Sequence, residues 1–298
     1  MYELIPVAGD TYYIDAGKCS IPLYMLDKCN AVMIDSGMSK LHRNGLLELF
    51  NKTGIKVRAI LTSHAHIDHT GNHSVIRELF GAKVYMSLYN AAVSQNILGL
   101  KSYFYGMSPK EIQSITSSMA CRVDNIILPD QQYVEACGAK FQILHLNGHS
   151  PEHIGFVTPD NVAYLADLFV GFDAIDDIKV PYSVSCQIDF ECKEKSLKYD
   201  YAWYILAHYG AYKDIEAIYM RNLILWNDRL NRLVKMAESE LFYDKYLTIA
   251  LKEFGVCTNN LFNITATERS IRSMLQYLVD KGRLKYAFKN GVQFFEQK

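Results

Sequence analysis

Short runs of apolar residues, separated by turn residues, characterise the first two-thirds of the chain. Runs of this length that are rich in β-branched and aromatic residues, and end at Gly, Asp or Ser, are typical of β-strands. The runs that we interpret as strands lie at residues 11–14, 23–26, 31–34, 57–62, 83–86, 141–144 and 162–165. The first three follow one another closely and predict a meander.

Helices are expected between the later strands. Residues 40–53 and 74–80 carry apolar side chains at helical spacing, and Gly81 is placed to end the second helix. We expect a further helix over residues 193–205. Strands that alternate with helices predict an α/β fold, in which binding groups lie on the loops at the ends of the strands.

Residues 88–125 interrupt this alternation. The segment is rich in aromatic residues, among them Tyr103 and Phe104, and Ser108 followed by Pro109 predicts the start of a helix. We interpret the segment as an insertion. Its aromatic residues either wall a substrate cleft or form core or dimer contacts, and we favour the second role.

The pattern near the C-terminus predicts a helix followed by a β-hairpin. Thr265 and Glu268 form a capping-box sequence at the start of a helix, and Gly282 is placed to end it. Asn290 and Gly291 then predict a two-residue hairpin turn. A helix followed by a hairpin at this place predicts a winged-helix-like module.

The chain is therefore expected to form two domains, residues 1–210 with the insertion and residues 211–298. No linker rich in Pro, Gly or Ser separates them, so we expect them to pack tightly. The second domain has 14 Lys and Arg against 10 Asp and Glu, a net charge of +4. This excess is too small to favour nucleic acid as a partner, and packing or homodimer formation is the preferred role.

Composition limits the class of protein. Half of the 298 residues are hydrophobic and 21% are charged, which excludes a disordered chain, and the net charge of −1 gives no general attraction to nucleic acid or anionic lipid. The N-terminus lacks the basic start and apolar run of a secretory signal, and no apolar stretch is long enough to span a bilayer. We expect a cytoplasmic protein without a membrane partner. The seven cysteines include no C-x-x-C pair and suggest no disulfide framework.

Four potential metal ligands, His64, His66, Asp68 and His69, lie within six residues directly after the predicted strand 57–62. Imidazole and carboxylate groups crowded in this way would perturb one another's ionisation in an ordinary core. A divalent cation removes this conflict because it accepts neutral imidazole nitrogens and a carboxylate oxygen together. In a tight loop, alternate residues can face different ions, so one cluster can begin two sites.

The remaining ligands must come from elsewhere in the chain. Three candidates follow predicted strands or helices: His149 in Gly-His-Ser, Asp167 in Ala-Asp-Leu, and His208 in Ala-His-Tyr. Together with the cluster they form a set of histidines and aspartates without cysteine, which leaves room for water and substrate, unlike a closed structural zinc site.

With these residues the chain resembles the metallo-β-lactamase superfamily. The H-x-H-x-D-H signature of that family matches residues 64–69, and its further landmarks match Asp35, His149, Asp167 and His208 in order. The chain departs from the common pattern at Asn147, where proline is frequent, and in the Ala-His-Tyr-Gly sequence around His208. Neither departure removes a ligand.

The resemblance implies a four-layer αββα sandwich with two metal sites. One site would use His64, His66 and His149, the other Asp68, His69 and His208, and Asp167 would bridge them. Zinc is the expected metal, with iron and manganese as alternatives. Asp35 is expected to hold a histidine or a loop in place and not to bind metal.

The expected function is hydrolysis of a small ester, thioester or lactam-like substrate by hydroxide that two metal ions activate. Asp68 is the expected catalytic residue, which orients the hydroxide or passes its proton to the leaving group. The layout is similar to glyoxalase-II-like and lactamase-like hydrolases with a C-terminal winged-helix-like domain. Two alternatives stay open: a metal-dependent endoribonuclease or phosphodiesterase, and a non-enzymatic nucleic-acid-binding or sensor protein with a structural metal core.

Four other histidines are not expected to bind metal. His153 is interpreted as a surface or capping residue in preference to a residue that supports the site. His42, His73 and His145 are interpreted as structural or solvated.

Overall fold

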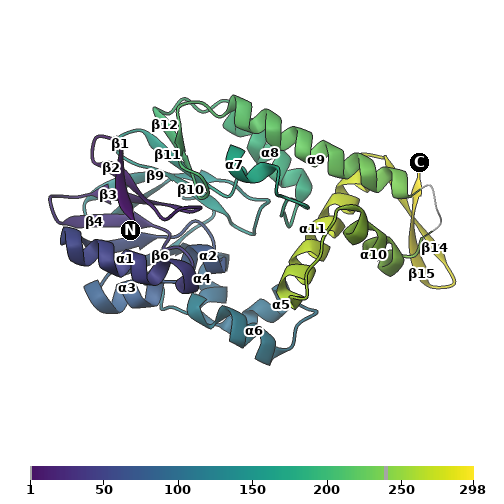
Figure 1. Cartoon of the computed structure of the whole chain (residues 1–298), viewed down its shortest axis with the longest axis horizontal. Coiled ribbons are helices and arrows are strands. Elements are labelled where there is room, and N and C mark those ends of the chain that lie inside the picture. Colours follow the sequence, from purple (N-terminus) through teal and green to yellow (C-terminus); the bar gives the residue numbers. More distant parts are fainter. Residues whose placement is uncertain (1, 238–240) are drawn as a thin grey trace.

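Two β-sheets stacked face to face form the centre of the sandwich in the computed structural model, which describes residues 2–237 and 241–298 (Figure 1). The first sheet has the strand order β1-β2-β3-β4-β5-β6-β7. Its strands are β1 (Glu3–Ala8), β2 (Thr11–Asp15), β3 (Ser20–Met25), β4 (Asn30–Ile34), β5 (Lys56–Leu61), β6 (Lys83–Ser87) and β7 (Asn125–Ile127). Strands β1 to β4 are antiparallel, as expected for a meander, and β4 to β7 are parallel.

The second sheet has the order β13-β12-β11-β10-β9-β8. Its strands are β8 (Tyr133–Ala136), β9 (Ala139–His145), β10 (Ile154–Val157), β11 (Val162–Ala166), β12 (Trp203–Leu206) and β13 (Ala211–Tyr212). Each strand is antiparallel to its neighbour except for the parallel pair β11 and β12. Strands β10 and β11 are buried along their whole length, because both faces of the sheet are covered.

Helices cover the outer face of each sheet. Between the sheets, Ile34 of β4 and Phe141 of β9 belong to one apolar core. On the outer side of the first sheet, Phe50 packs in a core that includes Ile60. The covering helices are α1 (Ser39–Thr53) and α3 (His73–Phe80) on the first sheet, and α7 (Phe172–Ile175), α8 (Cys186–Ser196) and α9 (Glu216–Met236) on the second (Figure 1). The short helix α2 (Ile67–Thr70) lies in the segment that follows β5. The predicted four-layer αββα sandwich is confirmed.

The predicted helix over residues 193–205 is wrong beyond Ser196. Helix α8 ends at Ser196, and Trp203–Leu206 is strand β12, which pairs in parallel with β11. A short, continuous apolar run such as Trp-Tyr-Ile-Leu fits a buried strand and a buried helix equally well. The neighbouring strand decides between them.

The 88–125 segment is a group of short helices beside the first sheet. It contains α4 (Leu88–Gln95), η1 (Ile97–Gly99), α5 (Leu100–Tyr103), α6 (Pro109–Thr116) and η2 (Ser117–Met119). The predicted helix start at Ser108 is confirmed: Ser108 Oγ accepts a hydrogen bond from the Glu111 backbone, and the Glu111 carboxylate accepts one from the Ser108 backbone.

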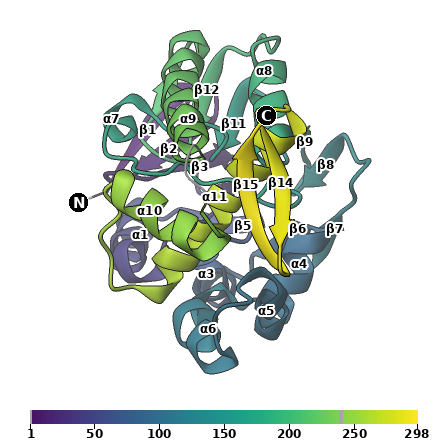
Figure 2. The ribbon, with the colours of Figure 1, turned by 90° about the vertical axis from the view of Figure 1, so that its right-hand side faces the viewer.

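The C-terminal part consists of helices and a hairpin that extend from the sandwich (Figures 1 and 2). Its elements are the far end of α9, α10 (Tyr243–Glu253), α11 (Leu261–Asp280), β14 (Leu284–Lys289) and β15 (Val292–Gln297). Asn290 and Gly291 have positive φ, as the predicted turn requires. The winged-helix-like character and the boundary at residue 210 stay predictions.

The predicted start of the last helix is wrong by one turn. Helix α11 begins at Leu261, and Asn260 Oδ1 accepts hydrogen bonds from the backbone of Phe262 and Asn263. Thr265 lies inside the helix, where its hydroxyl donates to the Leu261 carbonyl. The capping-box pattern at Thr265 therefore has no capping role. Among the described residues, no helix combines the length and apolar character needed to cross a bilayer.

Candidate metal centre

All seven predicted ligands converge at one edge of the sandwich. They lie on the four segments that follow strands β5, β9, β11 and β12, the first of which contains the short helix α2. The side chains form two groups, His64, His66, His149 and Asp167, and Asp68, His69, Asp167 and His208. In each group the candidate ligand atoms lie within 4.8 Å of one another, and Asp167 belongs to both.

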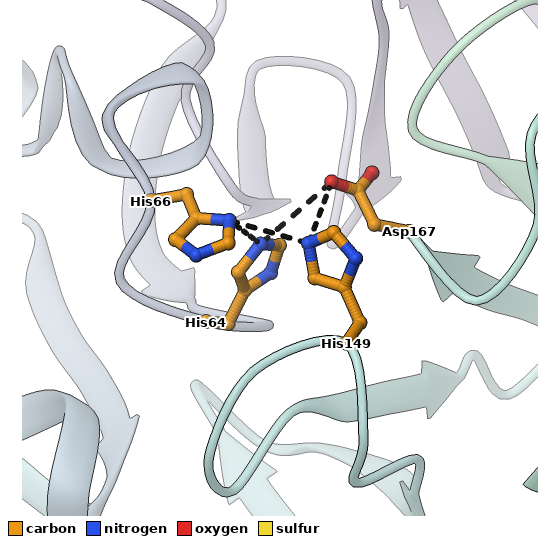
Figure 3. A group of neighbouring side chains, drawn as sticks. All are labelled: His64, His66, His149 and Asp167. Carbon is orange, nitrogen blue, oxygen red and sulfur yellow. Dashed lines mark hydrogen bonds and ion pairs between the residues drawn. The ribbon is translucent and has the colours of Figure 1, made fainter. Parts of the chain in front are cut away.

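The first group consists of three imidazoles and one carboxylate that face a common point (Figure 3). His66 Nδ1 lies 2.9 Å from His64 Nε2 and 3.2 Å from His149 Nε2. Asp167 Oδ2 lies 3.3 Å from His149 Nε2 and 3.7 Å from His64 Nε2. Nitrogen and carboxylate donors in this arrangement are typical of a zinc-type site.

The second group is more open to solvent. His69 Nε2 lies 3.3 Å from Asp167 Oδ2 and 3.8 Å from Asp68 Oδ2. His208 Nε2 lies 3.6 Å from Asp167 Oδ1 and 3.7 Å from Asp68 Oδ2. The side chains of Asp68 and His208 are 28% and 35% exposed, so water and substrate can reach this side of the centre.

Two buried atoms of the second group fit a metal ion. His69 Nε2 and Asp167 Oδ1 are buried and have no hydrogen-bond partner among the described residues. An unsatisfied buried polar atom costs roughly 1–3 kcal/mol, and an ion bound in the centre would remove this cost. The donor set therefore fits divalent cations.

Burial sets the protonation of the first group. It lowers the pKa of His64 and His149 well below the ordinary value and that of His66 to about 4. Burial also opposes the charge on His208, but the nearby carboxylates of Asp68 and Asp167 outweigh this effect and raise the pKa of His208 to about 9. Neutral imidazoles in the first group are the form that binds a metal ion.

Asp35 fixes the orientation of the His69 ring through Nδ1, the ring nitrogen that faces away from the centre. Its Oδ2 accepts hydrogen bonds from His69 Nδ1 at 2.8 Å, from Tyr164 Oη at 2.8 Å and from Ser63 Oγ at 2.6 Å. Its Oδ1 accepts one from the Ser63 backbone at 2.8 Å. With its Nδ1 held in this way, His69 directs Nε2 into the centre, and Asp35 has the supporting role that the sequence predicted.

The insertion reaches the site, which sequence reasoning did not favour. Tyr103 Oη lies 3.2 Å from His66 Nε2, on the side of the ring that faces away from the centre, and forms a hydrogen bond with Tyr182. Phe104 lines a cavity of about 290 Å³ together with His66 and Asp167. Tyr103 and Phe104 also belong to a buried apolar core cluster, so the preferred core role is confirmed for them. The same two residues wall the site as well, so the two roles coexist.

His153 is the histidine that sequence reasoning misplaced. It is completely buried, its Nδ1 donates to the Leu146 carbonyl at 2.9 Å, and its ring centre lies 4.9 Å from that of His64. It is therefore neither a surface residue nor a cap. His73 is structural as expected, because it is buried between the hydroxyls of Ser36 and Thr62.

Gly148 permits the backbone path that carries His149. Its φ is +121°, and a Cβ at this position would lie 2.3 Å from the backbone nitrogen of Asp189 in α8. We expect Gly148→Ala to destabilise the fold by about 2–4 kcal/mol through backbone strain and overpacking, measured by urea denaturation. The control is Gly54→Ala, which has φ +73° but open space around the new Cβ and is expected to cost about 1–2 kcal/mol. Equal losses in the two variants would contradict the role of the α8 contact.

Comparisons with known proteins agree with this geometry. A hydroxyacylglutathione hydrolase, GloC, of Haemophilus influenzae is 27% identical over 173 residues, which cover 57% of this chain and 72% of that protein. A metallo-beta-lactamase family protein from Thermus thermophilus has a similar structure with a TM-score of 0.73 at 13% identity, covering 100% of this chain and 98% of its own. A beta-lactamase domain protein from Burkholderia ambifaria gives a TM-score of 0.71 at 15% identity, covering 99% and 94%.

Both structural matches extend over essentially the full length of this chain. The sequence profile of the Metallo-beta-lactamase superfamily matches residues 19–208, a range that contains all seven candidate ligands. The chain therefore belongs to the metallo-beta-lactamase superfamily, whose members are typically metal-dependent hydrolases.

Proposed function

We propose that the chain hydrolyses a small thioester at a centre of two divalent cations, with zinc as the expected metal. His64, His66 and His149 would hold one cation, Asp68, His69 and His208 the other, and Asp167 both. The observation that carries the proposal is the pair of four-residue groups that share Asp167, with His69 Nε2 and Asp167 Oδ1 buried and without a hydrogen-bond partner among the described residues.

Bound cations and the protein side chains would each contribute to the reaction. Cations bound at the centre would lower the pKa of a water molecule and polarise the substrate carbonyl. The histidines and Asp167 would fix the cations, and Asp35 would keep His69 in the required orientation. Asp68 lies on the exposed side within reach of His208, and its carboxylate could accept a proton from the attacking water and deliver it to the leaving group.

The choice of a thioester is supported by the relative from Haemophilus influenzae, which is named as a hydroxyacylglutathione hydrolase. Esters and lactams present the same carbonyl to a nucleophile, so the site geometry alone favours none of the three. A panel of hydroxyacylglutathione, a simple ester, a lactam and single-stranded RNA tests the substrate class. Hydrolysis of the thioester is expected, and cleavage of RNA alone would favour a nuclease instead.

Metal removal provides a direct test of the centre. Elemental analysis of protein purified without added metal is expected to give two divalent ions per chain. Treatment with a chelator should abolish hydrolysis and lower the melting temperature, since a bound ion stabilises the folded state, and zinc should restore both. Full activity after complete metal removal would contradict the proposed mechanism. Loss of stability without any hydrolytic activity towards the panel would favour a structural metal core.

The hydrogen bond between Tyr103 and His66 leads to a further prediction. Tyr103→Phe should weaken metal binding about tenfold. This is the lower end of the range for residues that orient a metal ligand, and we expect the lower end because the hydrogen bond to His66, at 3.2 Å, is long. Competition with a chromogenic chelator measures the affinity. Tyr105→Phe is the matched control, since Tyr105 belongs to the same segment, is 57% exposed and bonds to Glu268 away from the centre. Equal affinities of the two variants would show that Tyr103 does not support His66.

A further inference from the structure

A second cavity, of about 400 Å³, opens onto the other side of the centre. His149, Asp167 and His208 line one part of it, and His149, Asp167 and Tyr182 also line the cavity that Phe104 lines. Much of the remaining wall is apolar and includes Phe169, Val180 and Trp226. A substrate whose reacting carbonyl lies at the centre could therefore extend an apolar group into this cavity.

The apolar wall contains one buried cation, Lys193 of α8. The residue is 4% exposed, and its ammonium lies 5.8 Å and 5.7 Å from the ring centres of Phe169 and Trp226, which line the same cavity. Lys193 Nζ donates one hydrogen bond, to Asp189 Oδ2 at 2.5 Å, and this is the one bond it makes to the residues that the structure describes. An ammonium group has three donors, so two are left for a ligand or water.

The charge of the neighbouring carboxylate limits what this ammonium can accept. Asp189 is 1% exposed, and together with Lys193 it forms a buried pair without net charge. A second carboxylate beside the pair would leave a buried net negative charge, which is costly in an apolar environment. A neutral oxygen, such as a ketone or hydroxyl, can accept a hydrogen bond from Lys193 without this cost.

We propose that this cavity binds the acyl group of the substrate, and that the acyl group is an apolar chain with a neutral oxygen acceptor at its far end. Lys193 donates a hydrogen bond to that oxygen, and Phe169 and Trp226 contact the chain. This inference rests on the proposed hydrolytic function for the position of the carbonyl. The inference makes Lys193 on α8 a specificity-determining residue, although Lys193 is not near any candidate metal ligand in the sequence.

Calorimetry on the metal-loaded protein tests the inference without any need for turnover. The probes are unbranched carboxylic acids of increasing length and the oxo acids of equal length that carry a ketone next to the last carbon. At one or more lengths the oxo acid is expected to bind about 10-fold to 100-fold more tightly, the effect of one hydrogen bond to a charged donor. Lys193→Met should abolish this preference, so that the oxo acid and the plain acid of each length bind with equal affinity.

Two further variants keep the test interpretable. Lys193→Met leaves Asp189 without its partner and can destabilise the fold, whereas the double variant Asp189→Asn/Lys193→Met removes both charges and is expected to fold. Lys195→Met is the matched control on the exposed face of α8 and should keep the preference for the oxo acid. Equal binding of oxo and plain acids by the unaltered protein at every length would overturn the inference, as would tighter binding of acids with a second carboxylate.

The same pairs of acyl groups, presented as thioesters, separate this inference from the proposed function. The ratio of kcat/KM for oxo-acyl and plain acyl thioesters should follow the ratio of binding constants and fall to about one in the double variant. Preferential binding of oxo acids without hydrolysis of any thioester would contradict the proposed function and leave the cavity assignment in place. Hydrolysis with the same kcat/KM for both acyl types would contradict the cavity assignment alone.

Discussion

Asp167→Asn is expected to lower kcat/KM for thioester hydrolysis by about 10³-fold to 10⁵-fold, the range found when one member of a catalytic unit is removed. Asp167 is the one residue that belongs to both candidate ligand groups. Its Oδ2 lies 3.3 Å from both His69 Nε2 and His149 Nε2. The amide has nearly the same shape but no charge to offset two cations, so elemental analysis should also find fewer than two ions per chain.

The control for this variant is Asp130→Asn, which makes the same chemical change at an exposed position that belongs to neither ligand group. It should retain full activity and metal content. If Asp167→Asn kept both ions and lost activity, Asp167 would act on the substrate and not as the shared ligand. If it kept both ions and full activity, the assignment of the centre would fail.

The candidate site could be predicted because its chemistry is concentrated in the sequence. His64, His66, Asp68 and His69 leave few structural interpretations for so short a segment. The distant candidates were recognisable because each follows a predicted strand or helix, and loops at the strand ends gather at one edge of an α/β sheet. The structure brings these residues together in the two groups that the family resemblance implied.

The residues that support the site could not be found in this way, because their roles depend on contacts between distant segments. Tyr103 and His66 meet across 37 positions of the chain, and the Arg269 guanidinium lies 3.5 Å from the centre of the Tyr103 ring. No local pattern distinguishes Tyr103 from other aromatic residues of the insertion. His153 was wrongly predicted to be a surface or capping residue for the same reason. Its burial follows from the pairing of strands β9 and β10, and the residues next to it in the sequence do not indicate it.

Errors in the predicted elements have a related cause. Trp203–Leu206 becomes a strand because β11 offers it a parallel partner, and Thr265 loses its capping role because Asn260 begins the helix earlier. In both cases the local sequence favoured one structure only weakly, and another interaction, a strand pairing in the first case and an earlier helix cap in the second, determined the outcome. The hairpin turn at Asn290 was predicted correctly, because positive φ at two adjacent positions is a strictly local requirement.

Asp35→Asn is expected to destabilise the fold by about 3–5 kcal/mol, the cost of breaking a buried charged network. The amide nitrogen would replace an oxygen that accepts hydrogen bonds from His69, Tyr164 and Ser63. To avoid two donors facing each other, His69 would move its proton from Nδ1 to Nε2. His69 Nε2 could then no longer bind a cation, so one of the two metal ions should bind about 10-fold to 100-fold more weakly.

Urea denaturation of metal-free protein measures the first effect, and chelator competition measures the second. The Asp130→Asn variant again provides the control for replacing a carboxylate with an amide. Tyr164→Phe removes one donor to Asp35 and leaves the hydrogen bond of His69 intact, so it should lower stability by about 1–2 kcal/mol without the loss of metal affinity. If Asp35→Asn lowered stability alone and both ions still bound with unchanged affinity, Asp35 would support the loops of the sandwich and have no influence on the orientation of His69.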